Sequence, residues 1–178
     1  MKTIAIIQAR LGSKRFPKKI FKKINGISLI EILLKRVTQV TKLNNIILAT
    51  SDKETDKPLV ELAEDLSFNV YQGSETDVLD RFYNAAKIHS AETIIRITGD
   101  CPFNDPKLIN QVLEIYKTEK SDYASNTNPP TYPDGLDVEV FSFKALEECW
   151  LNAKSSYDRE HVTPYIIKSN LFKKSNLK

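Results

Sequence analysis

The sequence predicts an α/β fold of the doubly wound type, with a mostly parallel sheet and helices on both of its faces. Short apolar runs such as residues 3–9 (TIAIIQA) are typical of strands that are buried on both sides. Longer segments with apolar residues at helical spacing separate these runs. Because strands that alternate with helices pair in parallel through right-handed crossovers, we expect the helices to cover both faces of the sheet.

The first half of the chain predicts the order strand, helix, strand, helix, strand. The strand at residues 3–9 leads into a polar, basic loop. A helix follows at residues 28–40, because apolar side chains dominate one of its faces and Ser28 with Glu31 fits a capping box. The remaining elements of this half are a strand at residues 45–50, a helix at 56–66 and a short strand at 68–71.

The second half continues this alternation and then becomes less regular. We expect a helix at residues 77–88, a strand at 93–97 that ends in the sequence GDCP, and a helix at 106–118. Beyond residue 126 come a loop rich in Pro, Asn and Thr, a strand at 136–141, and helices at 142–151 and 158–168. The sequence therefore predicts one domain over residues 1–178, with a core at 1–125 and an appended subregion at 126–178.

The composition is that of an ordinary globular protein. Of the 178 residues, 41% are hydrophobic and 28% are charged. No apolar run approaches the roughly 18 residues of a membrane span, and Gln8 interrupts the first run too early for a signal peptide. Cys101 and Cys149 lie far apart and lack the spacing of a zinc or redox site, so we expect both to be reduced. These features predict a cytoplasmic protein that does not bind a membrane.

Positive charge is concentrated near the N-terminus. The first thirty residues hold eight of the 26 Lys and Arg and none of the 23 Asp and Glu, so the other residues carry a net negative charge. This asymmetry argues against a uniformly basic nucleic-acid binder. A protein that binds nucleic acid through a basic arm alone stays open as the weakest alternative, because no set of stacking aromatic residues accompanies the arm.

The loop after the first strand, residues 8–19 (QARLGSKRFPKK), has the composition of an anion site. In open α/β sheets, ligands bind at the carboxyl ends of the strands, which is where this loop begins. Gly12 allows backbone N–H groups to approach an anion, Ser13 adds a hydroxyl, and Arg15 and Lys19 can bond phosphate oxygens. A triphosphate suits this much charge. A solvated basic loop is the alternative.

A second polar loop follows the strand at residues 93–97. Asp100 comes directly after this apolar strand, and such a carboxylate commonly holds Mg²⁺ together with water and substrate phosphate oxygens. An N-cap of the next turn is the alternative for Asp100. The five glycines of the chain form neither a P-loop nor a G-x-G-x-x-G pattern, which excludes P-loop NTPases and dinucleotide dehydrogenases.

Six sequence blocks, in order, resemble the sugar-acid cytidylyltransferase family, which includes acylneuraminate and 3-deoxy-manno-octulosonate cytidylyltransferases. They are most similar to its spore-coat-polysaccharide branch, and they span nearly the whole chain. The blocks are QARLGSKRFPKKI, ATSD, QGSETDVLDRF, RITGDCP, YPDGLDVEVFS and DREHVTPY. The resemblance implies a Rossmann-like nucleotidyltransferase that transfers CMP from CTP to a sugar or sugar acid, with Mg²⁺ and release of pyrophosphate, in surface polysaccharide or glycan precursor biosynthesis.

The resemblance also implies roles for residues of the core. Ala9 and Arg10 would lie against the cytosine and ribose, and Arg81 would reach the nucleotide from the third helix, although a surface residue paired with Asp77 is the alternative. The triphosphate would be held by Gly12, Ser13, Arg15 and Lys19. Arg15, Lys19 and Asp100 would be the catalytic residues, with Asp100 as the metal ligand.

The sugar would bind in the subregion at residues 126–178. Asp137 and Glu139 alternate with apolar residues, so both should point to one face of their strand, although a solvated polar face also explains the alternation. His161 would contact the substrate or cap a helix. The candidate sugar-binding residues are Asn126, Tyr132, Asp134, Asp137 and Glu139.

This sequence departs from the family pattern at two places. Lys18 stands where the family usually has glycine; if this position has φ > 0, lysine costs roughly 1 kcal/mol. Relatives also continue into a segment that supplies a second metal-binding carboxylate. Here Asp137 or Glu139 would supply it, or the chain is a truncated, inactive nucleotide-binding module that acts by association. Relatives often dimerise, so the resemblance also allows a homodimer.

Overall fold

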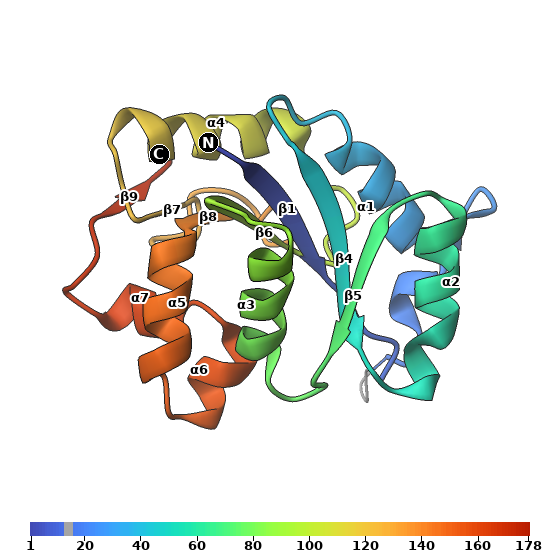
Figure 1. Cartoon of the computed structure of the whole chain (residues 1–178). Helices are drawn as coiled ribbons and strands as arrows, with labels where there is room; N and C mark the ends of the chain where they lie inside the picture. The colour runs from blue at the N-terminus through green and yellow to red at the C-terminus, as the bar shows by residue number, and fades with distance from the viewer. Residues whose placement is uncertain (13–15) are drawn as a thin grey trace.

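The computed structural model describes residues 1–12 and 16–178. The predictions for Ser13 and Arg15 therefore fall outside the described residues. Figure 1 shows a central twisted sheet with helices packed on both faces, as the sequence predicts. None of the described helices is both long and apolar enough to cross a membrane.

The sheet has seven strands in the order β5-β4-β1-β6-β8-β7-β9. Strands β5, β4, β1 and β6 are parallel, and β8 runs antiparallel to both β6 and β7. Strand β9 pairs in parallel with β7 at one edge. The bounds are β1 Thr3–Gln8, β4 Asn45–Ser51, β5 Asn69–Gly73, β6 Thr93–Thr98, β7 Tyr123–Ser125, β8 Glu139–Ser142 and β9 Lys174–Asn176.

The helices form a layer on each face of the sheet (Figure 1). Helices α1, α2 and α4 cover one face, where they pack on Ala5 and Ile7 of β1. Helices α3, α5, α6 and α7 lie on the other, over Ile4 and Ile6 of the same strand. Their bounds are α1 Leu29–Val37, α2 Lys57–Asp65, α3 Val78–Ile88, α4 Pro106–Thr118, α5 Phe143–Asn152, α6 Ser156–His161 and α7 Pro164–Lys168.

Smaller elements shape the connections. The Ser28 side chain accepts a hydrogen bond from the Glu31 N–H at the start of α1, which is one half of the predicted capping box. The Glu31 carboxylate pairs with Lys35. A two-stranded antiparallel hairpin precedes this helix. One 3-10 helix comes before the hairpin, and a second lies between β4 and α2. These elements are β2 Lys23–Ile24, β3 Ile27–Ser28, η1 Lys19–Phe21 and η2 Glu54–Asp56.

The C-terminal third differs from the sequence prediction in three respects. The predicted strand at residues 136–141 begins later, at Glu139. The predicted helix at 158–168 is two helices, because Val162 takes φ 71° and ψ −57° and Pro164 then starts α7. Strands β7 and β9 were not predicted, since three-residue strands leave almost no periodic signal.

Candidate active site

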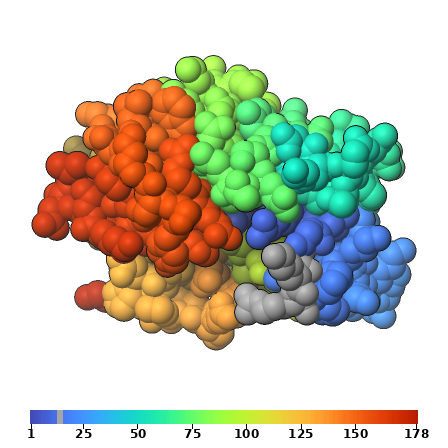
Figure 2. All heavy atoms as spheres, turned by 90° about the horizontal axis from the view of Figure 1, so that it is seen from below, coloured from blue at the N-terminus to red at the C-terminus, as the bar shows by residue number. Residues whose placement is uncertain are grey.

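The loops after β1 and β6 meet at the carboxyl ends of the parallel strands. Figure 2 looks at this end of the molecule, where the blue segment after β1, the gold segment around residues 126–135 and the orange-red segment of α6 and α7 come together. Gly99 makes the contact between the loops close. A Cβ atom at Gly99 would lie 2.6 Å from the Ala9 Cβ and 2.9 Å from the Gln8 carbonyl oxygen. The chain therefore needs glycine here to bring the GDCP loop against the basic loop.

Lys19 and Asp100 form an ion pair across these two loops. The Lys19 Nζ lies 2.5 Å from the Asp100 carboxylate, and both side chains are partly exposed. Burial alone would raise the pKa of Asp100, but the hydrogen bond and charge of Lys19 outweigh it and hold this pKa below its ordinary value. Lys18, just before, has φ 53°, so the backbone keeps the left-handed conformation that the family's glycine would favour.

Arg10 lies between two acidic side chains. Its guanidinium is 3.8 Å from Glu75 and 3.8 Å from Glu160 of α6, and all three side chains are at least a third exposed. A Cβ atom on Gly12 would lie 3.3 Å from the Glu75 carboxylate, so Gly12 of the basic loop also lies close to Glu75. At 3.8 Å these ion pairs are long and solvated, so an anionic ligand can exchange with the carboxylates. Arg10, Lys19, Glu75, Asp100 and Glu160 are called the nucleotide rim below.

Arg81 is buried beneath the nucleotide rim, with 2% of its surface exposed. Its Nη1 donates to the Ser74 carbonyl at 2.7 Å, while its buried Nε has no hydrogen-bond partner among the described residues. Burial, and then the charge of Arg10, lower its pKa, although a guanidinium stays protonated. The alternative of a surface residue paired with Asp77 is wrong, because Asp77 pairs instead with Arg159.

Asp56 is a buried carboxylate that the sequence analysis missed. It accepts the Leu11 N–H at 2.7 Å and the Thr50 hydroxyl at 3.1 Å, and it also accepts from the N–H and hydroxyl of Ser51. Four donors on one carboxylate fix the start of the basic loop to the end of β4. The SDKETD sequence after the second strand was the available signal, but its acids read equally well as a solvated turn.

A cavity of about 250 Å³ opens beside the nucleotide rim. It lies between the end of the sheet and the junction of α6 with α7. Most of its described lining residues are polar or charged. The lining residues are Arg96, Thr98, Thr127, Asp137, Glu139, Tyr157, His161, Thr163, Pro164 and Ile167.

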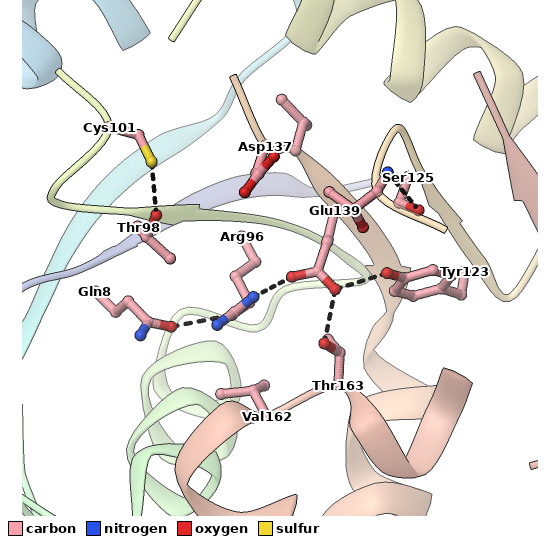
Figure 3. Close-up of polar contacts among 12 residues, drawn as sticks. Gln8, Arg96, Thr98, Cys101, Tyr123, Ser125, Asp137, Glu139, Val162 and Thr163 are labelled. Atoms are coloured by element: carbon pink, nitrogen blue, oxygen red, sulfur yellow. Dashed lines mark hydrogen bonds and ion pairs between the residues drawn. The ribbon is translucent and has the colours of Figure 1, made fainter. Parts of the chain in front are cut away.

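The floor of this cavity is a continuous hydrogen-bond network across four strands, drawn in Figure 3. Arg96 donates to the Gln8 side chain at 3.0 Å and pairs with the Glu139 carboxylate. Glu139 also accepts from the Tyr123 hydroxyl and from the Thr163 hydroxyl, each at 2.6 Å. Arg96 and Glu139 are 13% and 7% exposed, so the pair is largely removed from water. These five residues are called the cavity floor below.

The structure places two of the five predicted sugar-binding residues in the cavity wall, Asp137 and Glu139. Asn126 is 2% exposed, and its amide bonds the Leu136 carbonyl and the Val138 N–H, so it braces its own loop instead. Tyr132 packs against the core on the opposite side of the sheet, and Asp134 is absent from the described lining. His161 does line the cavity, where its ring lies 4.4 Å from the Tyr157 ring, tilted by 50°.

The model of the cytidylyltransferase family matches residues 4–176 of this chain. The chain belongs to the cytidylyltransferase family. It is therefore a nucleotidyltransferase, as the sequence predicts. The basic loop at the carboxyl end of β1 lies where ligands bind in open α/β sheets.

Individual relatives match nearly all of the chain. It is 50% identical to an uncharacterized protein of Methanocaldococcus jannaschii, over 97% of this chain and 70% of that one. It is 36% identical to the spore coat polysaccharide biosynthesis protein SpsF of Bacillus subtilis, over 91% of this chain and 72% of that one. A cytidylyltransferase structure from Leptospira borgpetersenii has a TM-score of 0.94 at 29% identity and covers 99% of this chain and 76% of that one.

The carboxylates of this site suit a divalent cation that substrate helps to hold. Within residues 1–12 and 16–178, no three His, Cys, Asp or Glu side chains form a metal site by themselves. Mg²⁺ is commonly held by one or two carboxylates together with substrate phosphates, and the ionised, partly exposed Asp100 fits that need. Burial, and then the charges of Asp134 and Glu139, raise the pKa of Asp137, so a cation beside it would be favourable.

The sequence offered Asp137 or Glu139 as the second metal carboxylate, and Glu139 does not fit this role. Both of its oxygens already accept hydrogen bonds, one from Arg96 and the other from Tyr123 and Thr163. Cys101 is buried, and burial raises the pKa of its thiol, so it packs the GDCP loop and is a poor nucleophile. The sequence analysis did not predict Arg96 and Thr163 as cavity residues, because their positions depend on strand pairing and on the α6–α7 junction.

Proposed function

We propose that this cytidylyltransferase transfers CMP from CTP to a sugar acid, with Mg²⁺ and release of pyrophosphate, to make a precursor of a surface polysaccharide. The observation that carries the proposal is the Lys19–Asp100 pair at 2.5 Å. It joins the basic loop to the GDCP loop and puts a cation for phosphate beside a carboxylate for a metal. The 250 Å³ cavity opens next to it.

CTP would bind along the basic loop at the end of β1. Its triphosphate replaces Glu75, Glu160 and Asp100 as the partner of the rim cations, and the buried charge of Arg81 supports it from below. This exchange removes exposed carboxylate pairs that are worth little by themselves. The proposed nucleotide-binding residues are Ala9, Arg10, Gly12, Ser13, Arg15, Lys19 and Arg81.

Asp100, together with Asp137 of the cavity wall, would hold Mg²⁺. When bound, the metal neutralises negative charge on the phosphates. Asp100 is suited to this role because its pKa is lowered, so the carboxylate is ionised at neutral pH. Lys19 and Arg15 then supply positive charge to the triphosphate, and Lys19 is released from Asp100 as it turns to the phosphate oxygens.

The acceptor sugar would lie in the cavity, against Asp137, His161 and the exposed side of the Arg96 guanidinium. One of its hydroxyl oxygens attacks the α-phosphorus in line with the departing pyrophosphate, which leaves with the electrons of the broken P–O bond. The hydroxyl proton passes to water. Catalysis of this kind depends on positioning and on charge neutralisation, so no covalent nucleophile is required.

Residues 1–125 would form the nucleotide-binding core, and residues 126–178 the sugar-binding subregion of the same domain. Strands β8 and β9 support this division of labour within one sheet, since they bring the second region beside β6 and β7. We further propose that the enzyme works in the cytoplasm, where CTP is available. The homodimer that the family resemblance allows is tested by light scattering of the purified protein.

A pyrophosphate-release assay tests the proposal. The purified protein is incubated with Mg²⁺, each of the four ribonucleoside triphosphates, and a panel of nonulosonic and octulosonic acids. CTP-specific release that needs one of the sugar acids is the expected result. CTP binding without turnover on any acid would favour the inactive nucleotide-binding module instead, and tight, salt-sensitive DNA binding without CTP binding would favour a nucleic-acid binder.

A further inference from the structure

Two consecutive residues of α6 connect this helix to Arg10 and Arg81 of the proposed nucleotide site, one directly and the other through Asp77. Glu160 lies 3.8 Å from Arg10. Arg159 grips the Asp77 carboxylate with three hydrogen bonds of 2.6 to 3.0 Å, and Asp77 is the N-cap of α3, the helix that carries Arg81. Helix α6 thus contacts Arg10 directly and reaches Arg81 only through Asp77, the N-cap of the helix that carries it.

The contact from Arg159 reaches Arg81 through a short chain of bonds. Asp77 caps α3 by accepting the Asp80 N–H at 2.9 Å, and its own N–H donates to the Ser74 hydroxyl at 3.0 Å. The Ser74 carbonyl accepts the one hydrogen bond described for the Arg81 guanidinium, at 2.7 Å. The position of the α3 N-terminus therefore sets the position of the Arg81 charge.

Helix α6 depends on such contacts, because it has six residues and none of its side chains is buried. A helix of that length is not stable alone. Arg159 fixes it at one side through Asp77 and through the Trp150 carbonyl at 2.8 Å. Fork-shaped pairing of a guanidinium with a carboxylate fixes direction as well as distance.

The other end of α6 is fixed by a strained turn. Val162 has φ 71° and ψ −57°, and the Thr163 N–H donates to the His161 carbonyl at 2.8 Å, which makes a γ-turn with a positive φ at a β-branched residue. Such conformations persist where the surroundings enforce them. Here Val162 is fully buried and the Thr163 hydroxyl bonds Glu139, so the turn ties α6 to the cavity floor (Figure 3).

We propose that Arg159 is a positioning residue for the reaction: it acts through Asp77 on Arg81, and it holds the nucleotide site in register with the acceptor cavity that α6 lines. This role rests on the proposed function, because it assumes that Arg81 serves a bound nucleotide. Arg159 itself touches neither substrate.

CTP affinity tests this role. Calorimetric titration of CTP is performed with Mg²⁺ and without an acceptor, well below the unfolding midpoint of every variant. Arg159→Ala weakens binding by roughly tenfold, and Arg159→Lys, which keeps the charge but loses the fork, recovers part of it. Lys168→Ala is the matched control. It removes another cation paired with α6, at 3.7 Å from Asp158, without contact to Asp77, and it changes CTP affinity by less than about twofold.

A double-mutant cycle separates positioning from general loosening. If Arg159 acts through Asp77, the tenfold loss in Arg159→Ala disappears in an Asp77→Asn background. A purely structural role would lower the unfolding midpoint of Arg159→Ala without changing CTP affinity, and this outcome would overturn the inference. Additive losses in the double variant would overturn it as well. A wild-type protein that fails to bind CTP would overturn the proposed function and the inference with it.

Discussion

The nucleotide rim and the cavity floor lie side by side, yet their charged residues are held in opposite ways. In the rim, Arg10 pairs with Glu75 and Glu160 at 3.8 Å, and these side chains are 36% to 52% exposed. In the floor, Arg96 and Glu139 are 13% and 7% exposed and have further partners at 2.6 to 3.0 Å. The rim holds cations that a ligand can take over, whereas the floor holds a cation that the protein has already satisfied.

This difference separates binding from support. Exposed ion pairs contribute about 0 to 1 kcal/mol to stability, whereas removing one partner of a buried pair costs about 3 to 5 kcal/mol. Substitutions in the rim should therefore change CTP affinity and leave stability nearly unchanged. Substitutions in the floor should lower stability and leave CTP affinity nearly unchanged.

The largest expected effect is on the cavity floor. Glu139→Ala leaves the Arg96 guanidinium buried without its counter-charge and removes the acceptor of Tyr123 and Thr163. The free energy of unfolding should fall by about 3 to 5 kcal/mol, measured by urea unfolding. The double variant Arg96→Met/Glu139→Leu should recover much of this loss, because no unpaired charge is left. A loss below 1 kcal/mol in Glu139→Ala would show that the floor is no more rigid than the rim.

The next effect is on the nucleotide rim. Arg10→Ala should weaken CTP binding more than tenfold, since it removes a charge-assisted contact of about 1.5 to 3 kcal/mol. Its free energy of unfolding should stay within about 0.5 kcal/mol of the wild type, because the carboxylates it leaves are exposed. Calorimetric titration and urea unfolding give the two values. Unchanged affinity would remove Arg10 from the nucleotide site.

A smaller effect concerns the backbone of the basic loop. Lys18→Gly should raise the free energy of unfolding by about 1 kcal/mol, because glycine adopts φ 53° without a Cβ clash. If the Lys18 charge helps to attract the triphosphate, the same variant binds CTP more weakly. Thermal unfolding and CTP titration separate the two effects. Lower stability in Lys18→Gly would mean that the side chain, and not the backbone, determines this turn.

The smallest effect concerns Cys149 in helix α5. Burial raises the pKa of the Cys149 thiol to about 12, and its Sγ donates to the Val162 carbonyl at 3.2 Å. A raised thiol pKa stabilises the fold below the unfolded pKa of about 8.5 and loses this contribution as pH rises toward 12. Between pH 8 and 9, wild-type stability should fall by about 0.7 kcal/mol more than that of Cys149→Ala. Equal pH dependence of the two proteins would contradict this burial.

The sequence predicted the parts of the fold that repeat a local pattern. The alternating strands and helices up to Thr118 appear in the structure close to the expected positions, since each has its own apolar periodicity. The meeting of the two polar loops also follows from sequence, because the carboxyl ends of parallel strands lie at one edge. The Lys19–Asp100 pair is the result.

The cavity and its supports could not be predicted in the same way. Arg96 faces Glu139 only because β8 pairs antiparallel with β6 in that register. Asp56 resembles an ordinary acidic turn residue in the sequence, and only the fold brings the Leu11 N–H to its carboxylate. Asn126 and Tyr132 were assigned to the sugar from their neighbourhood in sequence, but the fold turns them inward. Long-range pairing sets each of these positions, and one-dimensional patterns do not record it.

Pyrophosphate release by Asp100→Asn tests the central claim most directly. With Mg²⁺, CTP and the sugar acid that the wild type uses best, the rate should fall roughly hundredfold or more, because the carboxylate proposed to hold the metal is lost. CTP binding in the absence of metal should persist, since Lys19 is then free for the triphosphate. Turnover within a few-fold of the wild type would contradict the placement of the reaction between the basic loop and the GDCP loop.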